Sequence, residues 1–74
     1  MVIAPRVAVD VQVHSGEPVI EGTRVPVSVL VGAVAAGDSI EEVAGEYGLT
    51  PQDVRAALSY AAHLVEGETV RAPR

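Results

Sequence analysis

The chain has 74 residues, with ten acidic side chains, five basic ones and a formal net charge of −5. This length allows one domain. A core so small usually needs a disulfide, a bound metal or a partner subunit for stability. The sequence has no cysteine, which excludes disulfides and thiolate metal sites. The excess of acid argues against a freestanding polyanion binder, because non-specific nucleic-acid affinity comes mainly from neutralised phosphates.

The first third of the chain predicts a β ribbon over residues 7–27. From Val7 to Val13 every second residue is valine, which is typical of a half-buried strand. Residues 15–18 and 21–23 have the composition of turns, and the short apolar piece at residues 19–20 lies between them. An isolated ribbon is marginal in water, so we expect it to lie on the helices or to pair with another chain. The sequence leaves the strand pairing open, and also whether the ribbon is exchanged between subunits.

A first helix is predicted over residues 27–36. Pro26 precedes it and Gly37 follows it, as is usual at the two ends of a helix. The segment is apolar nearly all round, which favours burial on most sides. A monomer of 74 residues cannot cover such a helix, so we expect the chain to form a homodimer or a higher assembly.

Two further helices are predicted over residues 40–47 and 51–66. Ser39 and Glu42 have the spacing of a capping box at the start of the first, and Gly48 is expected to end it. Thr50 is the predicted N-cap of the second. Its buried face is expected to include Val54, Ala57, Leu58, Ala61, Leu64 and Val65. Gly67 is expected to end it.

The short turn at Gly48 between two apolar-striped helices predicts a helix-turn-helix. The expected fold class is therefore α+β, mainly α, with a short N-terminal β ribbon followed by a three-helix bundle that contains a helix-turn-helix. Residues 1–67 form the predicted single domain, and residues 68–74 are expected to be a flexible tail.

The early turns of the third helix would carry any DNA readout. The candidates are Thr50, Gln52, Arg55 and Ser59. Asp53 lies among them, and three glutamates precede them on the second helix. These acidic side chains repel phosphate. The helix-turn-helix pattern is therefore expected to serve packing or protein binding rather than DNA binding.

Other candidate residues concern contacts between proteins. Arg24 lies in the turn after residues 19–20, where it either pairs a local acid within a tight corner or contacts a partner. Arg71 and Arg74 in the tail serve solubility or enter an acidic pocket of a partner. The residues expected to support self-association are Val9, Val11, Val27, Leu30, Val31 and Val34.

No catalytic, metal-binding or cofactor-binding pattern is present in the sequence. His14 and His63 lie far apart without a third ligand at a suitable spacing, and there is no phosphate loop or nucleophile with a supporting base. We expect no enzyme and no cofactor. The longest uncharged stretch, residues 25–37, is shorter than the roughly 20 residues of a spanning helix. No export signal precedes it, so we expect no membrane contact and a cytoplasmic protein.

Three segments together resemble the domain of unknown function 433 family. They are residues 16–27 (GEPVIEGTRVPV), 36–43 (AGDSIEEV) and 47–54 (YGLTPQDV). The resemblance covers about residues 7–64 and implies a homeodomain-like helix-turn-helix. It also implies the antitoxin half of a toxin–antitoxin pair, because members often lie beside a gene for a PIN-like ribonuclease. Glu17 and Glu21 stand where the family often has basic residues, which lowers the expected affinity for DNA.

The leading hypothesis is therefore an antitoxin-like interaction protein that binds and neutralises a PIN-like ribonuclease toxin. The alternative is a helix-turn-helix transcriptional regulator that binds operator DNA, including that of its own operon. A third hypothesis is an oligomerisation module with no nucleic-acid role. A continuous basic face would favour DNA binding, whereas a purely protein-binding chain would lack one.

Overall fold

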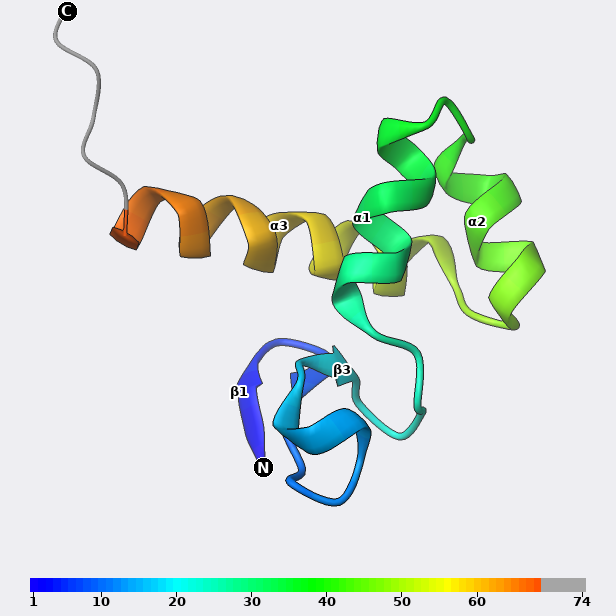
Figure 1. The fold of residues 1–74 in the computed structure, drawn as a ribbon. Coiled ribbons are helices and arrows are strands. Elements are labelled where there is room, and N and C mark those ends of the chain that lie inside the picture. Colours follow the sequence, from blue (N-terminus) through cyan, green and yellow to red (C-terminus); the bar gives the residue numbers. More distant parts are fainter. Residues whose placement is uncertain (69–74) are drawn as a thin grey trace, which may run out of the picture.

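A computed structural model describes residues 1–68, in which a three-stranded antiparallel sheet precedes three helices (Figure 1). The expected α+β, mainly α, fold class is confirmed. The strands are β1 (Val2–Ala4), β2 (Val7–Ala8) and β3 (Val19–Ile20). The helices are α1 (Val27–Ala35), α2 (Ile40–Tyr47) and α3 (Pro51–Glu68), and a short 3-10 turn covers His14–Gly16.

The sheet has the strand order β1-β2-β3, so the chain runs through it as a simple meander. Val7 of the middle strand pairs with Ala4 of β1 and with Ile20 of β3. Arg6 lies in the tight turn between β1 and β2, with a φ of 64°. This left-handed conformation is uncommon for a residue with a Cβ atom. It places the Arg6 side chain at the end of the sheet nearest α3, where its guanidinium meets Asp53.

The strand expected from Val7 to Val13 is wrong in its extent, because β2 ends at Ala8. Asp10 turns the chain: its side chain accepts a hydrogen bond from the Gln12 amide at 2.8 Å, and its carbonyl accepts one from Val13. This local bonding competes with strand pairing. Val11 consequently lies in a turn and is 80% exposed. The ribbon also begins earlier than residue 7, since β1 lies at Val2–Ala4.

The segment between β3 and α1 is a tight corner, as expected. The amide of Thr23 donates to the Ile20 carbonyl at 3.0 Å, and Gly22 supplies the φ of 80° that this turn requires. The Thr23 hydroxyl donates to the same carbonyl and accepts from the Val25 amide. The expected pairing of Arg24 with a local acid is wrong within residues 1–68, where Arg6 and Asp53 form the only ion pair.

The predicted signals at the ends of α2 are confirmed. Ser39 and Glu42 form the reciprocal capping box, with bonds of 3.0 and 2.8 Å. Gly48 has a φ of 68°, and the following amide, that of Leu49, donates back to the Ala44 carbonyl at 2.8 Å.

The other helix ends agree less well with the expectation. α1 ends at Ala35, one residue early. α3 continues through Gly67 to Glu68, so the expected end at Gly67 is wrong. A glycine lowers helix propensity but permits a helix to continue. The expected tail therefore begins within α3, and residues 69–74 lie outside the described residues.

We expect Ser39→Ala to lower the free energy of unfolding by about 1 kcal/mol, because it removes the acceptor for the Glu42 amide. Urea unfolding followed by circular dichroism would measure the change. Ser59→Ala is the control, since Ser59 is exposed within α3 and alanine suits a helix interior. Equal stability of the Ser39 variant and the parent would contradict the role of the cap.

The core lies between the sheet and the three helices. Its buried side chains are all aliphatic: Val7, Val19, Ile20, Val27, Leu30, Val43, Ala44, Val54 and Ala57. The last turns of α3 extend past the rest of the molecule (Figure 1). The expected burial of Leu64 and Val65 is therefore wrong, because they are 46% and 61% exposed. The first half of α3 holds the fold together, and the second half offers uncovered apolar side chains.

Candidate interaction surface

Two grooves flank the second half of α3, one on each side of Tyr60 and Leu64. The β1/α3 groove, of about 550 Å³, lies between Ile3, Ala4 and Pro5 and the α3 residues Ala56, Ser59, Tyr60, His63 and Leu64. The α1/α3 groove, of about 390 Å³, lies between the α1 residues Val27, Ser28, Val31 and Gly32 and the α3 residues Tyr60, Ala61 and Leu64, with Glu17 and Pro18 at its end. We call Tyr60 and Leu64, which line both grooves, the α3 ridge.

The walls of both grooves are mostly apolar, with few charged or titratable side chains. Glu17 is the one acid of the α1/α3 groove, and its carboxylate accepts a hydrogen bond from the Ser28 hydroxyl at 3.1 Å. His63 is the one histidine of the β1/α3 groove, and its ring nitrogen lies 2.9 Å from the Ser59 carbonyl. Such walls suit apolar segments of another protein chain better than a charged ligand.

An ion pair fixes the N-terminal hairpin against the start of α3. The Arg6 guanidinium lies 2.9 Å from Asp53, whose other oxygen accepts from the Thr50 amide at 3.1 Å. The Thr50 hydroxyl in turn accepts from the Asp53 amide, so Thr50 is the N-cap that the sequence predicts. The sequence did not reveal the ion pair, since its partners lie 47 residues apart.

These contacts lower the pKa of the Asp53 carboxyl. The hydrogen bond from the Thr50 backbone is the largest cause, partial burial acts in the opposite direction, and the Arg6 guanidinium adds to the lowering. Because the pKa is lower in the folded state, the carboxylate stabilises the fold above its unfolded pKa of about 4. This stabilisation is lost as the pH falls below that value and through the lowered pKa.

We expect Asp53→Asn to remove this part of the pH dependence. Between neutral pH and about pH 3, its free energy of unfolding should change less than that of the parent. Urea unfolding at a series of pH values would measure both curves. The pH dependence of a Glu42→Gln variant serves as the comparison, since hydrogen bonds from Ser39 lower the pKa of the Glu42 carboxyl in the same way. Parallel curves for the parent and the Asp53 variant would contradict the assignment.

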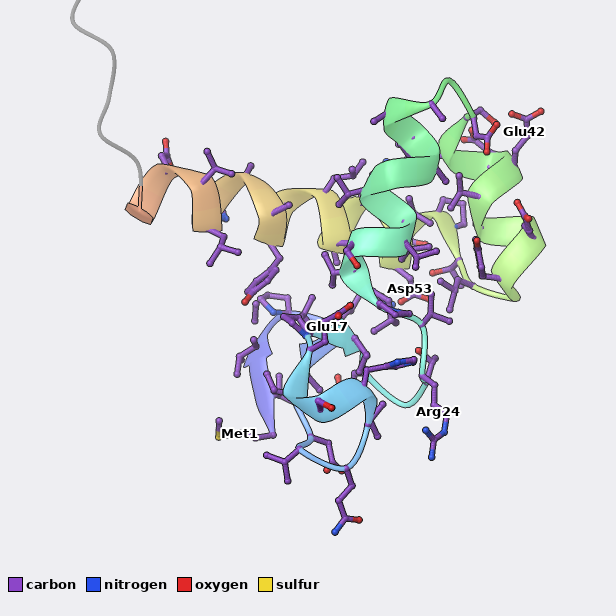
Figure 2. The ribbon with its side chains drawn as sticks, viewed as in Figure 1. Met1, Glu17, Arg24, Glu42 and Asp53 are labelled. Carbon is purple, nitrogen blue, oxygen red and sulfur yellow. The ribbon has the colours of Figure 1, made fainter. Side chains whose placement is uncertain are left out.

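The candidate DNA-reading residues only partly form a site. Gln52, Arg55 and Ser59 are exposed and follow one another at helical spacing along α3. The backbone amide and hydroxyl of Thr50 are engaged by Asp53. Arg24 lies apart from these residues, on the corner after β3, and its side chain points away from the body (Figure 2). The tail arginines Arg71 and Arg74 lie outside the described residues.

The residues expected to support self-association divide into three groups. Val27 and Leu30 are 6% and 0% exposed and belong to the chain's own core, so they are not free for a second copy. Val11 is exposed, but it lies in a turn rather than on a strand. Val9, Val31 and Val34 are half-buried, and Val31 lines the α1/α3 groove. Sequence reasoning missed both groove residues: the helical pattern assigned Leu64 to the core, and half-buried Tyr60 was given no role.

Residues 1–68 contain no group of three or more potential metal ligands among histidine and acidic side chains. His14 instead contacts the Arg24 carbonyl, with its ring nitrogen 3.0 Å away. None of the helices in this part of the chain has the length and the apolar content that crossing a membrane requires.

The chain belongs to the family described as protein of unknown function DUF433, whose model matches residues 7–61. The resemblance found in the sequence is thereby confirmed. The chain is also similar to Rv2018 from Mycobacterium tuberculosis, a protein of known crystal structure, at 38% identity and a TM-score of 0.65. The match covers 70% of this chain and 24% of Rv2018, so the chain spans about a quarter of that protein's length. Among curated proteins, none matches the chain.

Proposed function

We propose that this chain is an antitoxin-like interaction protein of the cytoplasm, which binds and neutralises a PIN-like ribonuclease. The observation that carries the proposal is the β1/α3 groove, where apolar side chains stay exposed beside a helix that projects from the body. Ile3 is 38% exposed and Leu64 46% exposed. An inhibitor of this kind needs no catalytic group of its own, because it acts by covering a surface of its partner.

The groove is built to receive a partner with little rearrangement. Its two walls belong to the N-terminal hairpin and to α3, and the Arg6–Asp53 ion pair joins these elements. A surface that is already ordered loses less entropy when a partner binds. Covering its apolar side chains contributes roughly 25 cal/mol for each Å² removed from water. These properties support a protein segment with an apolar face as the ligand.

Arg24 offers a charged contact to the same partner. Its guanidinium makes no hydrogen bond or ion pair with residues 1–68, and its side chain points outward (Figure 2). Its backbone is held by the contact with His14 and by the turn at Gly22. A cation on such an ordered corner fits an acidic pocket of the nuclease. Arg71 and Arg74 are proposed to add to this contact.

The test combines the chain with a PIN-like ribonuclease, taken from the neighbouring gene if one is encoded there. We expect a complex of defined stoichiometry in size-exclusion chromatography and loss of RNA cleavage. Ile3→Asp should weaken inhibition at least about tenfold, because binding would bury a charge without a partner. Val11→Asp is the control, since Val11 is exposed but lies outside both grooves. Unchanged RNA cleavage at an excess of the parent protein would overturn the proposal.

A second candidate function is operator binding by a helix-turn-helix. The tight turn at Gly48 between α2 and α3 supports it, and so do the exposed side chains of Gln52, Arg55 and Ser59. The charges near α3 oppose strong binding of DNA. Within residues 1–68, Arg6 is paired with Asp53, and Arg55 is the one arginine on α3. The preceding helix, α2, adds three exposed acidic side chains, those of Glu41, Glu42 and Glu46.

We therefore expect the isolated protein to bind generic duplex DNA weakly or not at all at about 150 mM salt, a roughly physiological ionic strength. Fluorescence anisotropy over a salt series would measure this. Where the nuclease complex binds a specific operator, Arg55→Ala should abolish that binding and leave the circular dichroism spectrum unchanged. Tight binding of random duplex by the isolated protein, with a steep salt dependence, would contradict the charge argument.

A further inference from the structure

We infer that the partner enters the β1/α3 groove as an extended segment, which pairs with the free edge of β1 as a fourth strand of the sheet. This inference rests on the proposed function and deepens it, because it names the form of the partner segment that the groove binds. The sheet offers backbone hydrogen-bonding groups to such a strand, and α3 offers an apolar surface beside it. Addition of a strand to an exposed sheet edge is a general mode of peptide recognition.

The two edges of the sheet differ in what covers them. The strand order β1-β2-β3 places β1 at one edge and β3 at the other. The chain itself covers the outer edge of β3, where the Ile20 amide donates to the Val25 carbonyl at 3.0 Å. The Val27 amide likewise donates to the Pro18 carbonyl at 3.0 Å. Within residues 1–68, no strand pairs with the outer edge of β1, so this is the edge at which another chain can pair.

The bonding pattern of β1 shows which of its backbone groups face outward. The Met1 nitrogen donates to the Val9 carbonyl, and the Val9 amide donates to the Met1 carbonyl, both at 2.8 Å. This exchange of two bonds defines a hydrogen-bonded pair of an antiparallel ladder, so the next pair, Val2 with Ala8, is a non-hydrogen-bonded one. The amide and the carbonyl of Val2 therefore point away from β2. A strand laid against β1 would bond to both groups.

The surroundings of this edge are apolar. Val2 and Ile3 are exposed, and β1 contains neither a charged residue nor a proline, which commonly protect edge strands from pairing. β1 lies on the side of the sheet toward which α3 projects (Figure 1), and the two elements form the walls of the β1/α3 groove. A strand added to β1 would therefore lie beside the α3 ridge.

This arrangement specifies a pattern for the partner segment. The side chains of a strand point alternately to its two faces, and α3 contacts the middle strand from one face of the sheet. Every second side chain of the added strand would thus face the α3 ridge, and the others would face solvent. We expect a short segment in which apolar and polar residues alternate. An amphipathic helix would instead have apolar residues three and four positions apart.

Val2→Pro removes the outward amide and leaves the α3 wall of the groove unchanged. Proline has no backbone N–H, and an edge strand tolerates it where that group faces outward. The printed bonds between Met1 and Val9 do not use the Val2 amide, so we expect the variant to fold like the parent. Val2→Ala is the matched control, because it also shortens the side chain but keeps the amide. Val2→Pro should weaken inhibition of the PIN-like ribonuclease at least about tenfold relative to Val2→Ala.

Inhibition constants for RNA cleavage measure this difference, and circular dichroism verifies folding. Equal inhibition by the proline and alanine variants would overturn the added strand and leave the proposed function intact. A helical partner segment would give this equal result, since it would contact side chains without bonding to the edge of β1. A parent protein that fails to inhibit the ribonuclease would overturn the proposed function and the added strand together.

Hydrogen exchange of the parent protein is a second measurement, which needs no substitution. The Val2 amide should exchange rapidly in the free chain, because it faces water. Pairing with a strand of the ribonuclease should slow its exchange at least about tenfold, as measured by NMR. The Val11 amide is the internal control, since Val11 is exposed in a turn outside both grooves. Exchange of the Val2 amide at the same rate in the free chain and in the complex would overturn the inference.

Discussion

Leu30→Ala is expected to lower the free energy of unfolding by about 2–5 kcal/mol, which is as large as the whole stability of many small domains. Leu30 is fully buried and belongs to the cluster in which the sheet meets all three helices. Removing its side chain leaves a cavity that the surrounding valines fill only in part. Much of the protein should therefore be unfolded at 37 °C, a temperature chosen as roughly physiological.

Urea unfolding followed by circular dichroism would measure this loss. Val29→Ala is the matched control, because Val29 is the preceding residue of the same helix and is 39% exposed. Its effect should stay within about 1 kcal/mol, as for most partly exposed positions. Similar losses for the two variants would show that α1 does not present Leu30 to the core.

Gly48→Val is expected to destabilise the domain by about 2–3 kcal/mol, with a clear fall in the melting temperature. Gly48 has a φ of 68° and a ψ of 32°, a conformation that a β-branched residue resists. A Cβ atom there would meet no neighbour within 4 Å, so the cost arises from the backbone alone. The valine would also disturb the bond from the Leu49 amide to the Ala44 carbonyl.

Gly48→Asn separates this backbone effect from other causes. Asparagine tolerates the left-handed region better than other residues with a Cβ, so it should cost less than half as much as valine. Thermal unfolding followed by circular dichroism would compare the two variants with the parent. Equal melting temperatures for the parent and the valine variant would contradict the turn that joins α2 to α3.

The ends of α2 could be predicted because their signals are local. Ser39 and Glu42 lie three residues apart, and the left-handed turn needs only Gly48 itself. The extent of β2 could not be predicted in this way, because the side chain of Asp10 outcompetes the alternation of valines. The alternation shows which residues suit a strand, but not whether a partner strand is present to pair with them.

The candidate surface was harder to predict, because it depends on the arrangement of whole elements. The apolar period of α3 continues through Leu64, but the neighbouring elements cover only the first half of the helix. Sequence periodicity shows which face of a helix is apolar, whereas burial depends on how far the neighbours extend. The Arg6–Asp53 pair was missed for a related reason, since it needs the hairpin to dock on α3.

Because Tyr60 and Leu64 line both grooves, we expect binding in one groove to be thermodynamically linked to binding in the other. A molecule that fills one groove restricts the rotamers of these two side chains, and a second molecule then encounters a ridge that is already ordered. Such ordering gives positive cooperativity when both ligands prefer the same rotamers, and negative cooperativity when they prefer different ones. The effect is reciprocal: whatever factor one ligand applies to the affinity for the other, the second ligand applies to the affinity for the first. Two side chains on one helix thus suffice to couple what binds in one groove to what binds in the other.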